Sequence, residues 1–379
     1  MRKAIYENDT FRLGGNIHLN ACVGNNGFPD LHTYQLGYYE ATIALFKSVK
    51  KSKFNVDSLI YPIVFCARHA IELFLKNQLY NLKYINAKAQ GKEFEYKLQT
   101  IHSIRDLWQE YKELIAVDIR YEPYINALEE YIADFYEVDN TGETFRYPFD
   151  HEEVRHLTDF GCINIEIFEE RFIKLYAIVD ELGYLTDFLT HEYNECTVIS
   201  GLSRQQIKEI ALELPPKEEW KQDKFLKIKN EILQKHGISS NKFSKALTLI
   251  KNHREFASYV GIEIPLKEID CDDLKKFIAL FRKYRNKFKT DDYVDVINDY
   301  ANTICEELSP DNICGISTLF DIGYFDLYPE AYERILEEKK TKDIFDIVFG
   351  DLSVGRGIIL EKIKIALDLL GQKTLLKCI

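Results

Sequence analysis

The sequence predicts an all-α protein, in which a helical bundle is followed by a second domain of smaller helices, with at most one short β-hairpin. Two observations lead to this fold class: apolar residues recur at spacings of three and four along most of the chain, and strand-like alternation is almost absent. The length of 379 residues and the hydrophobic content of 46% are sufficient for two domains with cores of their own.

Residues 1–32 are expected to form a loop-rich N-terminal segment, because Gly, Asn and Pro concentrate in residues 13–30. From Thr33 onward the spacing predicts a helix, whose apolar face carries Tyr38, Ala41, Leu45, Phe46 and Val49. A second helix is predicted over residues 57–82, with Pro62 near its first turn, where the missing N–H is harmless. This helix is apolar on nearly all sides, which is typical of a buried central helix.

Arg68, His69 and Glu72 are ionisable residues on this predicted central helix. Arg68 and Glu72 are four positions apart and His69 and Glu72 are three apart, so the carboxylate can contact both partners on one face. Charged groups are costly in apolar surroundings unless they are paired, so these residues either form a structural cluster, which is the favoured interpretation, or line a cleft. His102, at the start of a later helix, is interpreted first as a cap or core contact and second as a base.

The remaining helices divide between two domains. Helical stretches around Leu107 and Leu128 and an apolar stripe from 165 to 182 complete an N-terminal domain over residues 33–195. The C-terminal helical domain is predicted over residues 200–379, with a first helix that Ser203 caps and Pro215 and Pro216 end. Its further helices are expected at residues 223–236, 241–253, 272–289, 292–308 and 359–370.

Residues 223–256 have the outline of a helix-turn-helix, with a turn at Gly237 between two helices. Four basic residues of its second half are candidates for nucleic-acid contacts: Lys242, Lys245, Lys251 and Arg254. Acidic residues are interleaved with them, so ordinary packing of a helix pair is the favoured interpretation of this segment.

Composition restricts the classes of partner and the compartment. A formal net charge of −12 repels polyanions, so a nucleic-acid site has to be a local basic patch. The eight cysteines are scattered without metal-ligand spacing, so the sequence predicts no metal site and no cofactor, and mostly reduced, buried thiols. The N-terminus lacks the pattern of a signal peptide, and no apolar run approaches the roughly 18 residues of a membrane span. We therefore expect a cytoplasmic protein that has no membrane partner.

The segment "ETFRYPFDHEEVRHL", residues 143–157, places arginines and histidines close together and allows two backbone geometries. In the first, Asp150 is an N-cap and Glu153 its capping-box partner, which puts His151 in the first turn of a helix. In the second, which is favoured because Pro148 disfavours helix before it, "TFRYP" and "VRHLT" are the arms of a short hairpin. Arg146 would then lie roughly across from Arg155 or His156.

Either geometry lets an arginine and a histidine face one phosphate. The guanidinium of Arg146 offers two parallel hydrogen bonds to phosphate oxygens, and a histidine such as His151 or His156 can move a proton to or from a ribose hydroxyl. This pair is the minimum for RNA cleavage without a metal. Composition alone favours the structural interpretation, in which Arg146 pairs with a carboxylate such as Glu143 and a histidine packs on Tyr147.

Three motifs carry a resemblance to a known family: "RHAIELFLK" at residues 68–76, "HSIRDL" at 102–107 and "FRYP" at 145–148. Together they resemble the HEPN superfamily, whose members are small helical domains of prokaryotic toxins and antiviral defence proteins. "NACVGNNG", "YYEA" and "YPIVFCARHAIEL" are similar to an uncharacterised bacterial HEPN-like group, as are "LSRQQIKEIALELP" and "HREFASYVG" in the second half. The resemblance covers most of the chain.

The resemblance implies an endoribonuclease effector of a toxin–antitoxin or antiphage system. HEPN ribonucleases form homodimers, in which Arg and His residues of an R-x(4 to 6)-H motif from both subunits line one cleft. Arg146 and His151 match that spacing, although Pro148 and a hairpin would place His151 in a turn. The partner of Arg146 is then His156 or the Arg68/His69 pair.

A second function stays open beside the nuclease. Some HEPN proteins have lost catalysis, so the resemblance also allows a non-catalytic adaptor, or a nucleic-acid- or nucleotide-binding component of a defence system. The partners implied by these two functions are RNA, a second copy of this chain and a protein encoded in the same defence operon.

Overall fold

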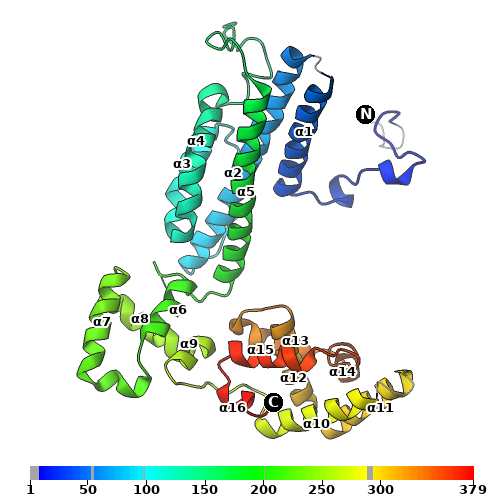
Figure 1. Ribbon diagram of the computed structural model, residues 1–379, viewed down its shortest axis with the longest axis vertical. Helices are drawn as coiled ribbons and strands as arrows, with labels where there is room; N and C mark the ends of the chain where they lie inside the picture. Colours follow the sequence, from blue (N-terminus) through cyan, green and yellow to red (C-terminus); the bar gives the residue numbers. More distant parts are fainter. Residues whose placement is uncertain (1–7, 53–54, 96, 98, 200, 288–292) are drawn as a thin grey trace. The chain divides into compact units, whose positions relative to one another are not determined.

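The computed structural model describes residues 8–52, 55–95, 97, 99–199, 201–287 and 293–379. These residues divide into two compact units, unit 1 (Met1–Ala87 and Glu93–Thr190) and unit 2 (Lys88–Lys92 and His191–Ile379). Figure 1 shows helices throughout both units. In the described ranges, β-structure is limited to two isolated bridges, Phe149 with Arg155 and Ile199 with Leu202. The all-α fold class is therefore confirmed.

Unit 1 begins with a mostly irregular segment that contains two short 3-10 helices, η2 (Ile17–Leu19) and η3 (Gly24–Asn26). The first long helix, α1 (Leu31–Ser52), starts two residues before the predicted position. Asp30 accounts for this start, because its carboxylate accepts hydrogen bonds from the backbone N–H and the hydroxyl of Thr33 at 2.8 and 2.7 Å.

The central helix of unit 1 is α2 (Val56–Ala89). It extends seven residues past the predicted end, and Pro62 lies in its second turn rather than its first. By length and composition α2 could cross a membrane, but 56% of its most apolar window is buried, as in the core helix of a soluble protein. The buried face includes Ile71, Leu75 and Leu82, each with no exposed surface.

Three further helices complete unit 1: α3 (Ile104–Leu114), α4 (Glu122–Asp139) and α5 (Ile165–Asn194). The short helices η4 (Ile115–Val117) and η5 (Ile119–Tyr121) connect α3 to α4. Stacked rings of Tyr39 and Tyr176, 3.9 Å apart, pack α1 on α5. A 2.6 Å hydrogen bond from Thr186 to Gln78 joins α5 to α2 inside the core.

The first part of unit 2 contains α6 (Arg204–Glu213), η6 (Lys217–Lys221), α7 (Asp223–Lys235), α8 (Ser240–Asn252) and α9 (Arg254–Tyr259). Ser203 caps α6 in a reciprocal capping box with Gln206, as the sequence predicted for the cap. These helices enclose a core cluster that includes Ile207, Phe243 and Phe256.

The second part of unit 2 comprises α10 (Cys271–Lys287), α11 (Tyr293–Glu307), α12 (Pro310–Tyr324), η7 (Pro329–Ala331), α13 (Tyr332–Lys340), α14 (Ile344–Gly350), α15 (Ile359–Leu369) and α16 (Lys373–Leu376). The buried centre is α12, which was not predicted because it is apolar on all sides and lacks helical periodicity. Gly323 permits its close approach to α15, since a Cβ there would lie 1.9 Å from the Lys362 carbonyl oxygen.

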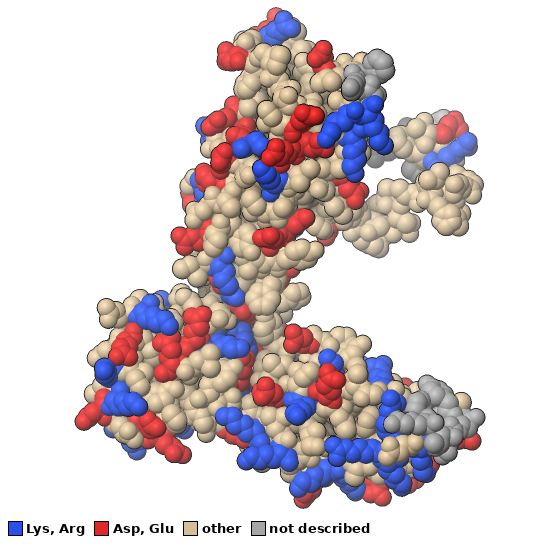
Figure 2. All heavy atoms as spheres, in the orientation of Figure 1, with Lys and Arg blue, Asp and Glu red and all other residues tan. Residues whose placement is uncertain are grey.

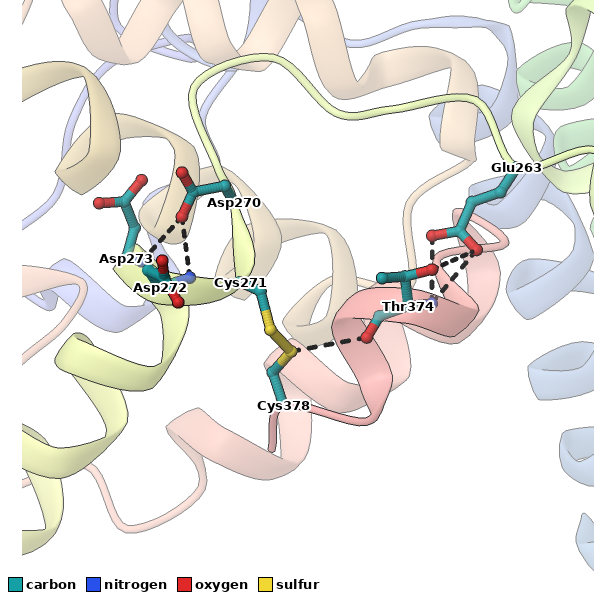
Figure 3. The surroundings of a disulfide bond; sticks show 7 residues. All are labelled: Glu263, Asp270, Cys271, Asp272, Asp273, Thr374 and Cys378. Carbon is teal, nitrogen blue, oxygen red and sulfur yellow. Dashed lines mark hydrogen bonds between the residues drawn. A yellow bond between two sulfur atoms is a disulfide. The ribbon is translucent and has the colours of Figure 1, made fainter.

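A disulfide joins Cys271, at the start of α10, to Cys378, 107 residues later (Figure 3). The expectation of mostly reduced thiols agrees with six free cysteines among eight, but the expectation that most of them are buried is wrong. The chain contains this disulfide, and of the six free cysteines only Cys314 is buried. The sequence did not indicate the pair, because only tertiary packing brings the two Cα atoms to 6.0 Å.

Candidate functional site

The segment between α4 and α5 forms a tight hairpin-like turn. The bridge joins Phe149 to Arg155, and the His156 N–H donates to the Pro148 carbonyl oxygen at 3.1 Å. The alternative with Asp150 as the cap of a helix is wrong, because no helix follows Asp150. Its carboxylate instead accepts the N–H groups of the turn, and the bond from Val154 lowers its pKa most.

A groove of about 730 Å³ lies beside this turn and is called the arginine groove here. It is bordered by the first turns of α2 and by residues 144–148 and 155–163. Arg146, Arg155 and His156 all line it. His151, the literal match to the R-x(4 to 6)-H spacing, is exposed in the turn and is not among the lining residues.

The guanidinium of Arg146 lies over two aromatic rings, at 5.6 Å from the centroid of Phe65 and 5.2 Å from that of Tyr147. Its Nη2 is 3.3 Å from the Tyr147 hydroxyl. Glu143 contacts Arg146 only through the backbone, by a 3.0 Å hydrogen bond from the Arg146 N–H, so the expected ion pair is absent. Within the described ranges, neither Arg146 nor Arg155 pairs with a carboxylate.

His156 is half-buried, and its Nε2 atom is shielded from solvent without a hydrogen-bond partner in the described part of the chain. A buried polar nitrogen without a partner is destabilising by about 1–3 kcal/mol.

A second set of ionisable residues surrounds the buried carboxylate of Glu72 and is called the Glu72 cluster: Arg68, His69, Glu72, Lys76 and His102. Glu72 Oε2 binds the Arg68 guanidinium, and Oε1 lies 2.8 Å from both Lys76 Nζ and His102 Nδ1. Burial alone would raise the pKa of Glu72, but contacts with His69 and Lys76 and the charge of Arg68 outweigh it and hold the pKa well below its usual range.

Arg68 has a structural role. Its side chain is 2% exposed, and besides Glu72 it donates to three backbone carbonyls, those of His102, Asp139 and Asn140. It thereby fastens the start of α3 and the end of α4 to α2. This arrangement confirms that Arg68 and His69 both contact Glu72, with His69 Nδ1 at 3.6 Å, and the burial of Arg68 keeps it from contacting a substrate in the solvent.

The two sets of residues are linked through aromatic rings on α2. Phe65, beneath Arg146, stacks on His69 at 5.8 Å with an angle of 7° between the planes. Tyr38 of α1 meets the edge of the same imidazole at 4.5 Å. The arginine groove and the Glu72 cluster are therefore neighbouring parts of one side of α2.

The candidate nucleic-acid residues of unit 2 differ in their surroundings. Arg254 pairs with Glu333 at 2.5 Å, lies over Tyr332 and is 14% exposed, so it belongs to the packing of unit 2. Lys242 lies against Gly201 and Lys251 is half-buried, while Lys245 is exposed. Figure 2 shows Lys and Arg side chains mixed with Asp and Glu across the visible face.

Arg155, which the hairpin prediction placed opposite Arg146 as an alternative to His156, lines the groove together with His156. Lys76 was not singled out from the sequence, and it completes the Glu72 cluster one turn beyond Glu72 on α2. The i,i+4 spacing from Glu72 was a usable signal for Lys76. No group of three His, Cys, Asp or Glu side chains suited to a metal occurs in the part of the chain that the structure describes.

Comparison with known proteins identifies no relative of this chain. No protein-family model, no curated protein and no solved structure matches the chain.

Proposed function

We propose that this chain is a metal-independent endoribonuclease of the cytoplasm, with the arginine groove as its active site. The observation that carries the proposal is the presence in one groove of two guanidinium groups without carboxylate partners and a histidine with an unpaired nitrogen. Elsewhere in the chain Arg68, Arg171 and Arg204 each bind carboxylates. In a protein with a net charge of −12, unpaired arginines in a groove favour a phosphate ligand.

The groove residues take distinct roles in such a reaction. Arg146 and Arg155 bind the two non-bridging oxygens of the scissile phosphate and stabilise the charge that builds up on them. Tyr147 and Phe65 restrict the Arg146 guanidinium through its contacts with their rings. His156 moves protons, because imidazole can accept and donate a proton near neutral pH.

The chemical step needs no group beyond the chain and the RNA. The ribose 2′-oxygen attacks phosphorus while His156 takes the proton of the 2′-hydroxyl. The bond from phosphorus to the 5′-oxygen then breaks, and the imidazolium returns the proton to that oxygen. The products are a 2′,3′-cyclic phosphate and a 5′-hydroxyl.

The resemblance to HEPN proteins supports three further elements of the proposal. These are that the chain forms a homodimer, that it is the effector of a toxin–antitoxin or antiphage system, and that it binds a protein encoded in the same defence operon. Expression of the wild-type chain should then slow growth, and Arg146→Ala should relieve this effect.

The direct test is cleavage of single-stranded RNA by the purified full-length chain in the presence of EDTA. Arg146→Ala and Arg155→Ala should each reduce the cleavage rate at least 100-fold, and His156→Asn should do the same. Arg105→Ala is the matched control, since Arg105 is an exposed arginine over Tyr136 outside the groove, and it should cleave as the wild type does.

Unchanged cleavage by Arg146→Ala would overturn the nuclease site. RNA binding that weakens steeply with salt, without any turnover by the wild type, would instead establish the non-catalytic binding function.

A further inference from the structure

Tyr61 is a half-exposed aromatic residue of the arginine groove that has no part in the reaction described above. It lies in the second turn of α2, lines the groove with Arg146 and is 47% exposed. Its ring packs against that of the buried Phe145, with 6.1 Å between the centroids and 51° between the planes. The groove therefore has an aromatic side chain that is supported by the core and still accessible to a ligand.

Two relationships place Tyr61 next to the proposed phosphate site. Along α2, Phe65 is four positions after Tyr61, and the Arg146 guanidinium lies 5.6 Å from the Phe65 ring centroid. Residues four apart lie on the same side of a helix, with roughly 5–6 Å between their Cβ atoms. Across the groove, the ring that Tyr61 contacts belongs to Phe145, the chain neighbour of Arg146. A nucleotide whose phosphate lies at Arg146 thus has its base within reach of Tyr61.

Two other half-exposed aromatic rings of the groove differ from Tyr61. The Tyr147 ring lies 5.2 Å from the Arg146 guanidinium, and its hydroxyl is 3.3 Å from Nη2, so Tyr147 supports that arginine. Phe160 belongs to the groove border at residues 155–163 and also lines a separate apolar cavity between α2, α4 and α5. Tyr61 is the one of these three that lies on α2 beside Phe65.

We propose that Tyr61 stacks on the base of the nucleotide whose phosphate Arg146 binds. This inference rests on the proposed function, whose substrate contacts it extends from the phosphate to the base. Tyrosine rings bind unpaired bases in this way, and stacking tolerates every sequence because each base has a π-face. Tyr61 then contributes affinity for base-bearing chains, whereas Arg146 contributes affinity for any phosphate.

The test compares two tetranucleotides by calorimetry with the full-length chain. One carries thymine bases, and the other carries tetrahydrofuran residues in place of the nucleosides, with the same phosphates and no bases. Neither has a 2′-hydroxyl, so neither is cleaved by the proposed reaction. The wild type should bind the thymine chain about 10-fold or more tightly than the baseless chain.

Tyr61→Leu should lower this ratio at least 5-fold, because leucine keeps an apolar contact with Phe145 but has no ring. Tyr61→Phe keeps the ring and should keep the ratio. Tyr184→Leu is the matched control, since Tyr184 is 77% exposed on α5 and is not among the groove residues, and it should also keep the ratio. Equal affinities of the wild type for the two chains, or an unchanged ratio in Tyr61→Leu, would overturn the proposal.

Cleavage kinetics separate this outcome from that of the proposed function. Stacking is present in the bound substrate and in the transition state alike, so Tyr61→Leu should raise KM at least 5-fold and change kcat less than 2-fold. RNA cleavage with an unchanged KM in Tyr61→Leu would overturn the base contact and leave the nuclease standing. A base-dependent affinity that Tyr61→Leu removes, in a chain that cleaves no RNA, would support the base contact and remove the nuclease.

Discussion

The Nδ1 atom of His102 lies 2.8 Å from Oε1 of Glu72, so a carboxylate that is 2% exposed on α2 orients an imidazole that is 69% exposed beside α3. The other Glu72 oxygen binds Arg68, which fastens the surrounding backbone. The Glu72 cluster is thus a structural centre with one accessible member, and it adjoins the arginine groove through Phe65 and His69.

Glu72→Gln should destabilise unit 1 by about 3–5 kcal/mol, because it leaves the buried Arg68 guanidinium without a countercharge. Urea unfolding can be followed by the fluorescence of Trp108, which is buried in unit 1, after Trp220 of unit 2 is replaced by Phe. Glu169→Gln, which removes the surface pair with Lys50, should cost less than about 1 kcal/mol. Equal losses in the two variants would contradict the structural role of the cluster.

The stability of unit 1 should decline in acid partly through Glu72. Its folded pKa is held below the unfolded value of about 4.3, so the unfolded state binds a proton that the folded state does not. The stabilisation is complete above that value and is lost as the pH falls below it. Free energies of unfolding from roughly pH 6 to pH 3 should therefore fall more steeply for the wild type than for Glu72→Gln. Parallel profiles would show that Glu72 does not contribute.

Gly142→Ala should destabilise unit 1 for two reasons. The residue has a φ of +85°, and an added Cβ would lie 2.9 Å from Nη1 of Arg68. Gly91→Ala isolates the first reason, because Gly91 has a φ of +66° and open space around it. We expect a loss of about 1–2 kcal/mol for Gly91→Ala and a clearly larger loss for Gly142→Ala in thermal unfolding. Similar losses would mean that Arg68 moves aside freely.

Removal of the Cys271–Cys378 disulfide should destabilise unit 2 by about 2–5 kcal/mol, because it closes a loop of 107 residues. Cys378→Ser without reductant should have the same unfolding midpoint as the wild type with excess dithiol. Cys22→Ser, which changes an exposed free thiol, should leave the midpoint unchanged. Alkylation and mass spectrometry should count six reactive thiols in the unfolded wild type before reduction and eight after it. Eight before reduction would contradict the disulfide.

Patterns of apolar residues in the sequence predicted most of the helices but not the residues at which they begin and end. The helix at residues 57–82 was predicted from its long, nearly continuous apolar sequence, and α2 continues to Ala89 because packing stabilises its last turns. The periodicity rule failed for α12, whose residues are buried on every side. In residues 143–157, Pro148 correctly favoured the turn over the helix.

Local spacing was sufficient to predict the all-α fold class, to place Arg68 and His69 within reach of Glu72, and to single out Arg146, because these features depend on spacings of three and four or on neighbouring residues. The hairpin prediction placed Arg155 or His156 across from Arg146, but the folded structure was needed to show that both line the groove while His151 does not, that Asp139 keeps an unpaired oxygen, and that Cys271 meets Cys378. Turns and packed helices bring these residues together, so their separation in the sequence does not predict the distances between them.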